Sequence, residues 1–450
     1  MRLTLLNRNQ IDKKSGHLKS PARKKRHYEI DNFDCNSFTN DQQLNFIRRK
    51  IKENNIEGKD ATVSVLGQAG DNLASALRVI TIKNEKEDFK IIVKVTQNVA
   101  RLLNEANIFS VITFTNEITM YHEVLPMMTE TQKNAGIEPR DMFPVPVCYG
   151  ASNETPHEII LLEDLTKEKY VMLDKFKPLP NDTIKLILRT LAQYHSLCFV
   201  LKEKLPEEFA GFCKKLVNMN TAEDFLHNEE SFKTVGHQLS KIFEDKLTAN
   251  IVIETINEQI DRSLRLEKCD KGSKYSIIVH GDCWTNNFLF KLEDDKPTKC
   301  IMIDYQLVRE APPVVDILHL ILNCTDYETR TKHYHEWIDY YHSQLEKHLD
   351  VHGLKVKSIY PKDKLESDLG RYAKIMLGLS IIANSLMVRN NEEIAKVKET
   401  MAEAETMESF AENFNMSGLH METVLLIKQR IEDIIRSCID FGYLNPNEYT

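Results

Sequence analysis

The spacing of apolar and polar positions becomes regular at residue 41, and up to residue 165 it predicts a small sheet with one main helix. Apolar residues at helical intervals predict helices over 41–54 and 113–134. Alternating or branched apolar runs between polar turns predict strands. The predicted strands cover residues 61–66, 73–83, 89–95, 144–150 and 157–165. Three strands, a helix and two more strands therefore form one mixed unit.

Beyond this unit the pattern is mainly helical. Residues 181–202 are periodic, residues 206–270 are helical and charged, and residues 314–450 are helical again. The helical pattern is interrupted over 275–305 by three short β-type runs, IIVHGD, NNFLFKL and CIMIDY. The turn EDDKPT joins the second run to the third, so we expect these two to form a hairpin.

Charge separates the beginning of the chain from the rest. The 450 residues carry a net charge of −8, but residues 1–27 alone carry +8, which leaves −16 for the remainder. Residues 1–40 are polar, basic and without periodicity, which predicts a disordered extension. Because the body of the chain is acidic, a general nucleic-acid-binding protein is excluded.

The cysteines and the longest apolar stretch indicate a cytoplasmic protein. Nine cysteines are scattered without a CxxC pair, which is typical of reduced thiols in the cytosol. The apolar stretch over 375–388 is shorter than the ~18–20 residues needed to span a bilayer, so we expect a buried helix there. The sequence MRLTLLNRNQ lacks the apolar core of a signal peptide.

Three polar residues flank the predicted hairpin. Asp282 and Asn287 lie in VHGDCWTNNFLF before its first strand, and Asp304 follows its second strand in CIMIDYQ. A loop before a hairpin and an acid just beyond its far strand fold onto one edge. Phosphoryl transfer needs a carboxylate that accepts the proton of the attacking hydroxyl and oxygen ligands that hold Mg²⁺. This edge is therefore the candidate for such chemistry.

These motifs resemble the kinase-like superfamily in its aminoglycoside phosphotransferase and choline kinase branch. More narrowly, the chain resembles the insect ecdysteroid kinase-like family over about residues 41–440. The matching segments are HGDCWTNN, FTNEITMYHEVLP (114–126), LLEDL (161–165) and the short path from Asp304 to Asp316.

The resemblance implies an α+β, two-lobed protein-kinase-like fold. A small antiparallel-sheet N-lobe with one main helix (41–165) would bind nucleotide, and a large, mainly helical C-lobe (166–450) would carry the catalytic loop and the acceptor-binding helices. Residues 1–40 lie outside the resemblance. ATP and Mg²⁺ are the implied cofactors.

The resemblance also assigns roles to individual residues. Asp282 matches the catalytic aspartate, and Asn287 and Asp304 match the magnesium ligands. Lys94 matches the strand lysine that contacts the α- and β-phosphates, and Glu117 matches its ion-pair partner. Independently, Lys94 lies in the apolar strand IIVKV, where a charge needs a partner. A lysine and a helix acid on solvent-facing surfaces are the alternatives.

Two further segments match nucleotide-binding positions. Gly67 and Gly70 occupy a turn between the first two strands, where backbone N–H groups can bind phosphate. An ordinary hairpin loop is the alternative. Glu163 and Leu165 lie where the strand-to-linker crossover would pair with adenine, and an ordinary interlobe connector is the alternative there.

The histidines are interpreted as structural. His280 supports the catalytic loop in this pattern, Asp316 matches the anchor of that loop, and His195 lies on an apolar helix face typical of a core position. The run over 332–352 has five histidines but no HExxH motif, which favours an amphipathic helix over a zinc site.

The acceptor is expected to be a small molecule. Asp304 is followed only 12 residues later by Asp316, which leaves no room for the segment on which a protein kinase docks a peptide. The family resemblance implies an ecdysteroid or a xenobiotic as the hydroxyl acceptor, and with it a role in detoxification. The protein is expected to be a monomer. A cationic acceptor of the choline or aminoglycoside type remains an alternative, as does a catalytically inactive pseudokinase that only binds ligand.

Overall fold

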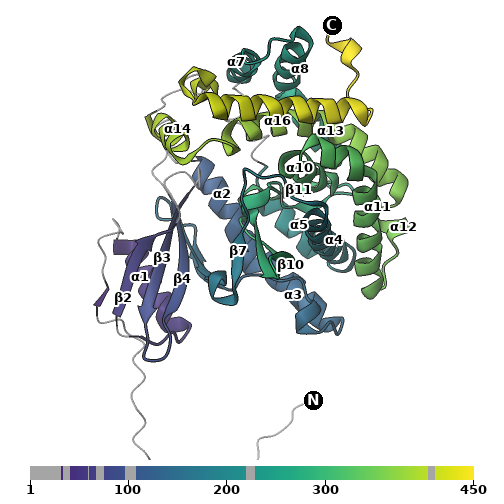
Figure 1. Ribbon diagram of the computed structural model, residues 1–450. Helices are drawn as coiled ribbons and strands as arrows, with labels where there is room; N and C mark the ends of the chain where they lie inside the picture. Colours follow the sequence, from purple (N-terminus) through teal and green to yellow (C-terminus); the bar gives the residue numbers. More distant parts are fainter. Residues whose placement is uncertain are drawn as a thin grey trace, which may run out of the picture.

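The computed structural model describes residues 32–33, 41–58, 60–66, 75–96, 108–218, 229–403 and 411–450. Figure 1 shows two lobes, with a sheet at one end of the molecule and a larger group of helices at the other. This is the predicted two-lobed α+β fold. Among the described residues, no helix combines the length and the apolar character needed to cross a membrane.

The N-lobe sheet has six strands in the order β1-β2-β3-β4-β6-β5. Its strands are β1 (Asn32–Phe33), β2 (Asp60–Val65), β3 (Ser75–Lys83), β4 (Phe89–Thr96), β5 (Cys148–Ser152) and β6 (Ile159–Glu163). All neighbours pair antiparallel except β1, which is parallel to β2. The sheet thus includes two residues of the segment predicted as a disordered extension. The divisions of the chain at residues 40 and 165 stay predictions.

One predicted strand is shorter than its apolar run. Residues 144–150 were expected to form a strand, but β5 begins only at Cys148. Pro144 and Pro146 have no N–H to donate to a neighbouring strand, so the ladder cannot include them regularly. The remaining predicted strands of this lobe are confirmed to within two residues.

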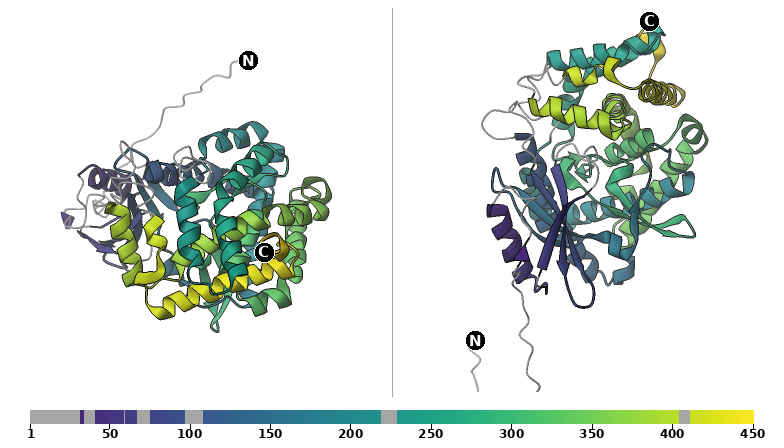
Figure 2. Two further views of the ribbon diagram at one scale, coloured as in Figure 1. Left: turned by 90° about the horizontal axis from the view of Figure 1, so that it is seen from above. Right: turned by 60° about the vertical axis from the view of Figure 1, so that its left-hand side comes forward.

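The predicted helix over 41–54 is confirmed as α1 (Asp41–Glu53). Leu44, Ile47 and Ile51 are buried on one side of α1 and pack with the apolar residues of the sheet. In the right-hand view of Figure 2, α1 (purple) lies beside one face of the sheet.

The predicted helix over 113–134 is divided into three parts. It consists of α2 (Ile108–Thr119), a π-helical turn (Met120–Val124) and α3 (Leu125–Asn134). Pro126 lies in the first turn of α3, where its missing N–H interrupts the helical hydrogen bonds.

The C-lobe is built around α10 (Val314–Cys324), all of whose residues are buried. The long helices around it are α4 (Asn181–Lys204), α11 (Tyr327–Val351), α13 (Lys362–Met387) and α16 (Met421–Asp440). The shorter ones are α5 (Pro206–Lys215), α7 (Glu229–Ser240), α8 (Lys246–Asn257), α9 (Gln259–Asp270), α12 (Val356–Ile359) and α14 (Asn391–Glu403). In Figure 1, α16 (yellow) lies across α13. The apolar stretch over 375–388 forms the whole second half of α13 and its C-cap residue, as expected of a buried helix.

Two small sheets interrupt the helices of the C-lobe. The predicted hairpin is confirmed as β9 (Phe288–Glu293) and β10 (Lys296–Met302), and β7 (Tyr170–Met172) pairs with β9. In the second sheet, β8 (Ile277–Val279) pairs antiparallel with β11 (Arg309–Ala311). These sheets hold the polar loops that lie between β8 and β9 and between β10 and β11.

Candidate active site

A buried lysine on the N-lobe sheet bridges two carboxylates. Lys94 Nζ lies 2.5 Å from Glu117 Oε2 on α2 and 2.6 Å from Asp304 Oδ1 after β10. Side chains alternate along β4, so Val93 and Val95 face α1 while Lys94 faces the opposite way, toward α2. With 6% of Lys94 and 1% of Glu117 exposed, the solvent-facing alternatives for both residues are wrong.

The charges of this cluster depend on one another. Burial by itself would lower the pKa of Lys94, but Asp304 and Glu117 more than offset it, and the pKa of the lysine is raised. Burial and the neighbouring Asp304 raise the pKa of Glu117. The Lys94 ammonium group therefore stays charged between the two acids. Its contacts connect the N-lobe sheet to α2 and to the segment after the hairpin.

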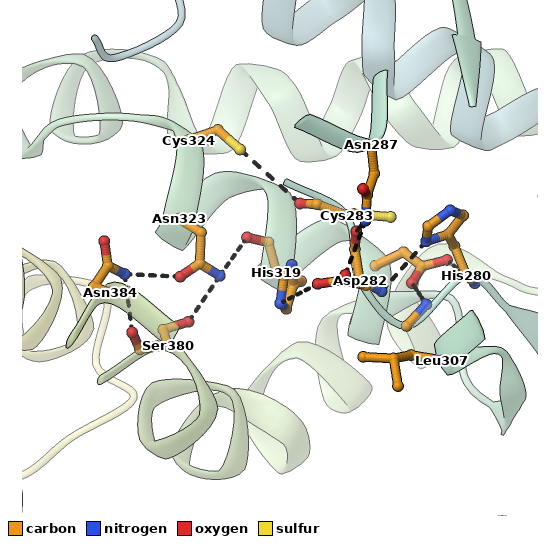
Figure 3. A network of polar contacts seen from close by, with 12 residues as sticks. His280, Asp282, Cys283, Asn287, Leu307, His319, Asn323, Cys324, Ser380 and Asn384 are labelled. Carbon is orange, nitrogen blue, oxygen red and sulfur yellow. Dashed lines mark hydrogen bonds and ion pairs between the residues drawn. The ribbon is translucent and has the colours of Figure 1, made fainter. Parts of the chain in front are cut away.

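The catalytic-loop candidate, Asp282, follows a glycine that the loop geometry requires. Gly281 has φ +81°, and a Cβ atom there would stand 2.2 Å from the carbonyl oxygen of Leu307. Asn287 then closes the loop, because its Nδ2 donates to the carbonyl oxygen of Asp282 at 2.9 Å and to Oδ2 of the same residue at 2.8 Å (Figure 3). These bonds fix the direction of the Asp282 carboxylate.

The Asp282 carboxylate has a raised proton affinity. Burial and the negative charge of Asp304 raise its pKa to about 6. His319 on α10 places Nε2 3.8 Å from Asp282 Oδ1, and burial lowers the pKa of that histidine. A carboxylate whose pKa lies near the working pH is suited to accept a proton in catalysis. His319 was not among the predicted site residues.

The hairpin register brings Asp304 beside Asn287. Phe288 pairs with Met302, and the N–H of Ile303 donates to the carbonyl oxygen of Asn287 at 3.0 Å. Asp304 adopts φ +67° and ψ +66°, a left-handed conformation that non-glycine residues adopt rarely. This backbone turn directs its carboxylate to Lys94 rather than along the strand.

Asp316 holds the start of the catalytic loop. Its Oδ1 accepts from the N–H of Gly281 and its Oδ2 from the N–H of His280, both at 2.7 Å. His195 Nε2 lies 3.0 Å from the same Oδ2. Burial by itself would raise the pKa of Asp316. The hydrogen bond from His195, the electrostatic interaction with that ring and the other donors outweigh burial, and they lower the pKa to about 2.

The two histidines near this anchor are buried supports, as their sequence context predicted. His280 donates through Nε2 to the carbonyl oxygen of Ile303 at 2.9 Å and accepts from the N–H of Asp282 at 3.3 Å. His195 also contacts the Tyr341 hydroxyl at 2.8 Å. Neither ring is positioned as a general base.

Asn116 is a second site residue that sequence reasoning missed. Its side chain pairs twice with the backbone of Val217, through bonds of 2.9 Å from Nδ2 to the carbonyl oxygen and from the Val217 N–H to Oδ1. Nδ2 also donates to the carbonyl oxygens of Gln306 at 3.1 Å and Val308 at 3.3 Å. Asn116 thereby ties α2, and with it the adjacent Glu117, to the segment that follows Asp304.

The model of the ecdysteroid kinase-like family matches residues 69–354. This match spans well over half of the chain and includes Lys94, Glu117, Asp282, Asn287 and Asp304. The chain belongs to the ecdysteroid kinase-like family. It is accordingly a phosphotransferase that acts on small-molecule hydroxyl groups. No curated protein matches it.

Solved structures similar to this family member include small-molecule kinases. Plasmodium vivax ethanolamine kinase has 11% identity and a TM-score of 0.41, covering 90% of this chain and 92% of that one. An aminoglycoside phosphotransferase in complex with GDP and kanamycin has 11% identity and a TM-score of 0.42, covering 82% and 93%. A GDP complex of a wild-type aminoglycoside 2'-phosphotransferase has 10% identity and a TM-score of 0.42, covering 87% and 99%.

Of the remaining nucleotide-binding candidates in this ecdysteroid kinase-like chain, the structure describes Glu163 and Leu165. Gly67 and Gly70 lie outside the described residues. The N–H of Glu163 donates to the carbonyl oxygen of Val147 at 2.9 Å, and the Glu163 carboxylate accepts from the N–H of Val147 at 3.0 Å. The N–H of Glu163 is therefore engaged within the N-lobe, and the carbonyl oxygen of Leu165 accepts from the N–H of Lys169. Pairing of either residue with adenine stays a prediction.

The residues at the hairpin edge fit a magnesium ion. Asp304 supplies carboxylate oxygen, and Asn287 uses its Nδ2 on Asp282, which leaves its amide oxygen as a ligand. Among the described residues no three His, Cys, Asp or Glu side chains are grouped to hold a metal by themselves. A magnesium ion typically takes one or two protein oxygens and completes its shell with phosphate and water, so this sparse set is suitable.

Proposed function

We propose that this protein transfers the γ-phosphate of ATP to a hydroxyl group of an apolar small molecule, either an ecdysteroid or a xenobiotic. The observation that carries the proposal is the buried contact of Lys94 with both Glu117 and Asp304, beside the Asp282–Asn287 loop. A cation for phosphate, two oxygen ligands for metal and a separate proton acceptor are the groups that phosphoryl transfer requires.

Each residue has a defined task in this proposal. Lys94 binds phosphate oxygens and is held in place by Glu117. Asn287 and Asp304 would hold Mg²⁺, which would neutralise phosphate charge. As the acceptor oxygen attacks the γ-phosphorus, its proton passes to the Asp282 carboxylate, the bond to the bridging oxygen breaks and ADP leaves. The raised pKa of Asp282 favours this proton transfer near neutral pH.

The path after Asp304 supports a small acceptor. The chain makes one short 3₁₀ turn (Tyr305–Leu307), pairs with β8 through β11 and enters α10 at Val314. This segment is engaged by β8 of the C-lobe and by Asn116 of α2, so it offers no free strand for a peptide substrate. A detoxification role follows from a xenobiotic acceptor. That the protein is a cytoplasmic monomer stays a prediction from the sequence.

The test is a transfer assay with γ-labelled ATP and Mg²⁺ against ecdysteroids, phenols, glycosides and choline. We expect label on an ecdysteroid or a phenol, and labelling of choline alone would establish the cationic-acceptor alternative instead. Failure of ATP and Mg²⁺ to raise the melting temperature would count against any kinase activity.

The role of Asp282 is tested with Asp282→Asn. We expect turnover to fall about 10²–10⁴-fold because the proton acceptor is lost, while ATP binding persists. Asp295→Asn is a matched control, because Asp295 lies in the β9–β10 turn with φ +59°, a conformation that asparagine tolerates. Unchanged turnover in Asp282→Asn would exclude the assigned role.

A further inference from the structure

A separate cavity of about 190 Å³ lies in the C-lobe, between the ends of α10 and α13, the middle of α16 and the chain around Phe176. Phe176, Leu426 and Ile434 provide apolar wall, and Asn384, Arg330 and Arg430 provide polar wall. Asp282, Asn287, Asp304 and Lys94 are not among the lining residues. The cavity is therefore distinct from the phosphoryl-transfer site.

Two guanidinium groups in this wall have only neutral hydrogen-bond partners. Arg430 Nη2 donates to the carbonyl oxygens of Lys175 at 3.2 Å and Phe176 at 3.0 Å, and Nη1 lies 3.5 Å from Asn384 Oδ1. Arg330 is 1% exposed, and its Nε donates to Ser437 Oγ at 2.8 Å. Within the described chain, neither arginine has a carboxylate oxygen within 4.0 Å. A charge buried as deeply as that of Arg330 is normally paired.

Arg330 satisfies most of its capacity at the end of a helix. Its Nη1 donates to the carbonyl oxygen of Thr325 and lies 3.5 Å from that of Leu322, and Nη2 is buried without a partner. Cations at a helix C-terminus are stabilised by the carbonyl groups there. Arg330 thus stabilises the C-terminal end of α10 and also adds positive potential to the cavity.

The two acids of the wall act on Arg330 more than on Arg430. Asp326 caps α11 by accepting from the N–H of Thr329 at 2.8 Å. Asp433 is half-buried, and burial raises its pKa. Both acids interact with Arg330, whereas the acid that acts on Arg430 is the exposed Asp174, outside the cavity wall. Arg430 is consequently the cation of this wall whose acidic neighbour lies outside the cavity.

We propose that the cavity binds a small organic anion with a ring-sized apolar body, whose acid group contacts Arg430. Cavities of about 150 Å³ hold a benzene ring, so the available volume accommodates one ring with a carboxylate or a similar group. Phe176, Leu426 and Ile434 would contact the ring, and the Arg430 guanidinium would form charge-assisted hydrogen bonds to the acid. This inference does not depend on the proposed kinase activity.

The cavity shares a wall with the supports of the catalytic loop. Asn384 donates to Asn323 Oδ1 at 2.8 Å, and Asn323 donates to the carbonyl oxygen of His319 at 2.8 Å (Figure 3). The neighbouring Cys324 has its sulfur 4.0 Å from the carbonyl oxygen of Cys283. A ligand in the cavity would therefore contact Asn323, which bonds to His319, and Cys324, which contacts the Asp282 loop at Cys283.

The charge preference is tested by calorimetric titration of the full chain with benzoate, benzyl alcohol and benzylamine at one ionic strength. We expect benzoate to bind at least tenfold more tightly than benzylamine, with the neutral alcohol between them. Equal or tighter binding of benzylamine would show that Asp326 and Asp433 dominate and would overturn the proposal. Absence of benzoate binding would overturn it as well.

The location is tested with two variants that act differently. Arg430→Gln removes the charge, and we expect benzoate to bind about tenfold more weakly. Leu426→Trp fills the cavity without changing its charge, so it should abolish benzoate binding. This variant tests the position even if Arg430→Gln acts only by loosening the Lys175–Phe176 segment. Lys428→Gln, on the same helix, removes an exposed ion pair to Glu244 and should leave benzoate binding unchanged.

A competition experiment separates this cavity from the nucleotide site. Benzoate affinity should be the same with and without saturating ATP and Mg²⁺, because the two sites share no residue. Loss of benzoate binding on addition of nucleotide would place the anion at the phosphate site instead. Unchanged benzoate binding in both Arg430→Gln and Leu426→Trp would equally refute the assigned position.

Discussion

Replacing Asp316 by asparagine would test how the catalytic loop is held. The carboxylate accepts from the N–H groups of Gly281 and His280 and contacts His195, and none of it is exposed. Asparagine has nearly the same shape but only one acceptor oxygen. Whichever way its amide is turned, an N–H of the side chain faces a backbone N–H of the loop, and one buried donor loses its partner.

The cost can be worked out from the contacts. The pKa of Asp316 falls from 3.8 to about 2 in the folded protein, and at 1.36 kcal/mol per pKa unit the charged form gains about 2–3 kcal/mol. That stability is fully present above about pH 4 and is lost as the pH falls through about 2. An unsatisfied buried N–H adds about 1–3 kcal/mol. We therefore expect Asp316→Asn to destabilise the protein by about 3–6 kcal/mol.

The assay is thermal unfolding followed by circular dichroism at pH 7. If all 450 residues unfold together, the expected destabilisation lowers the melting temperature by roughly 3–6 °C. The control is Asp339→Asn, which removes an ion pair of 2.6 Å to Lys362 with 73% of the Asp339 side chain exposed, and it should shift the temperature by about 1 °C or less. If both variants melt within 1 °C of the wild type, Asp316 does not anchor the loop.

Two further predictions concern the site itself. Because Asp282 with a pKa of about 6 must be ionised to accept a proton, kcat/KM should fall as the pH decreases through 6 and level off above it; a kcat/KM profile that stays flat down to pH 5 would contradict this assignment. Asn116→Asp places a carboxylate among the carbonyl oxygens of Val217, Gln306 and Val308, so it should weaken ATP binding at least tenfold in a titration, whereas Thr115→Ser on the same helix should not.

The motifs in the sequence were sufficient to predict the fold and much of the site's composition. Asp282, Asn287 and Asp304 are close along the chain and joined by one hairpin, so their meeting follows from local turn geometry and strand register. Lys94 was identified by its match to the strand lysine of the family, with independent support because a lysine within an apolar strand needs a partner. The predicted roles of these residues await the experiments above.

The tertiary structure alone decided what surrounds those motifs. Asn116, His319 and Arg430 carry no local signal, since an asparagine, a histidine or an arginine on a helix is usually a surface residue. Their contacts join segments about 40 to 250 residues apart, from α10 to the catalytic loop, from α2 to the chain after α5 and from α16 to the Lys175–Phe176 segment. Periodicity gives the face of a helix but not its neighbour. The sequence therefore determined which residues can perform the chemistry, and only long-range packing decided which of them are held, charged and buried together.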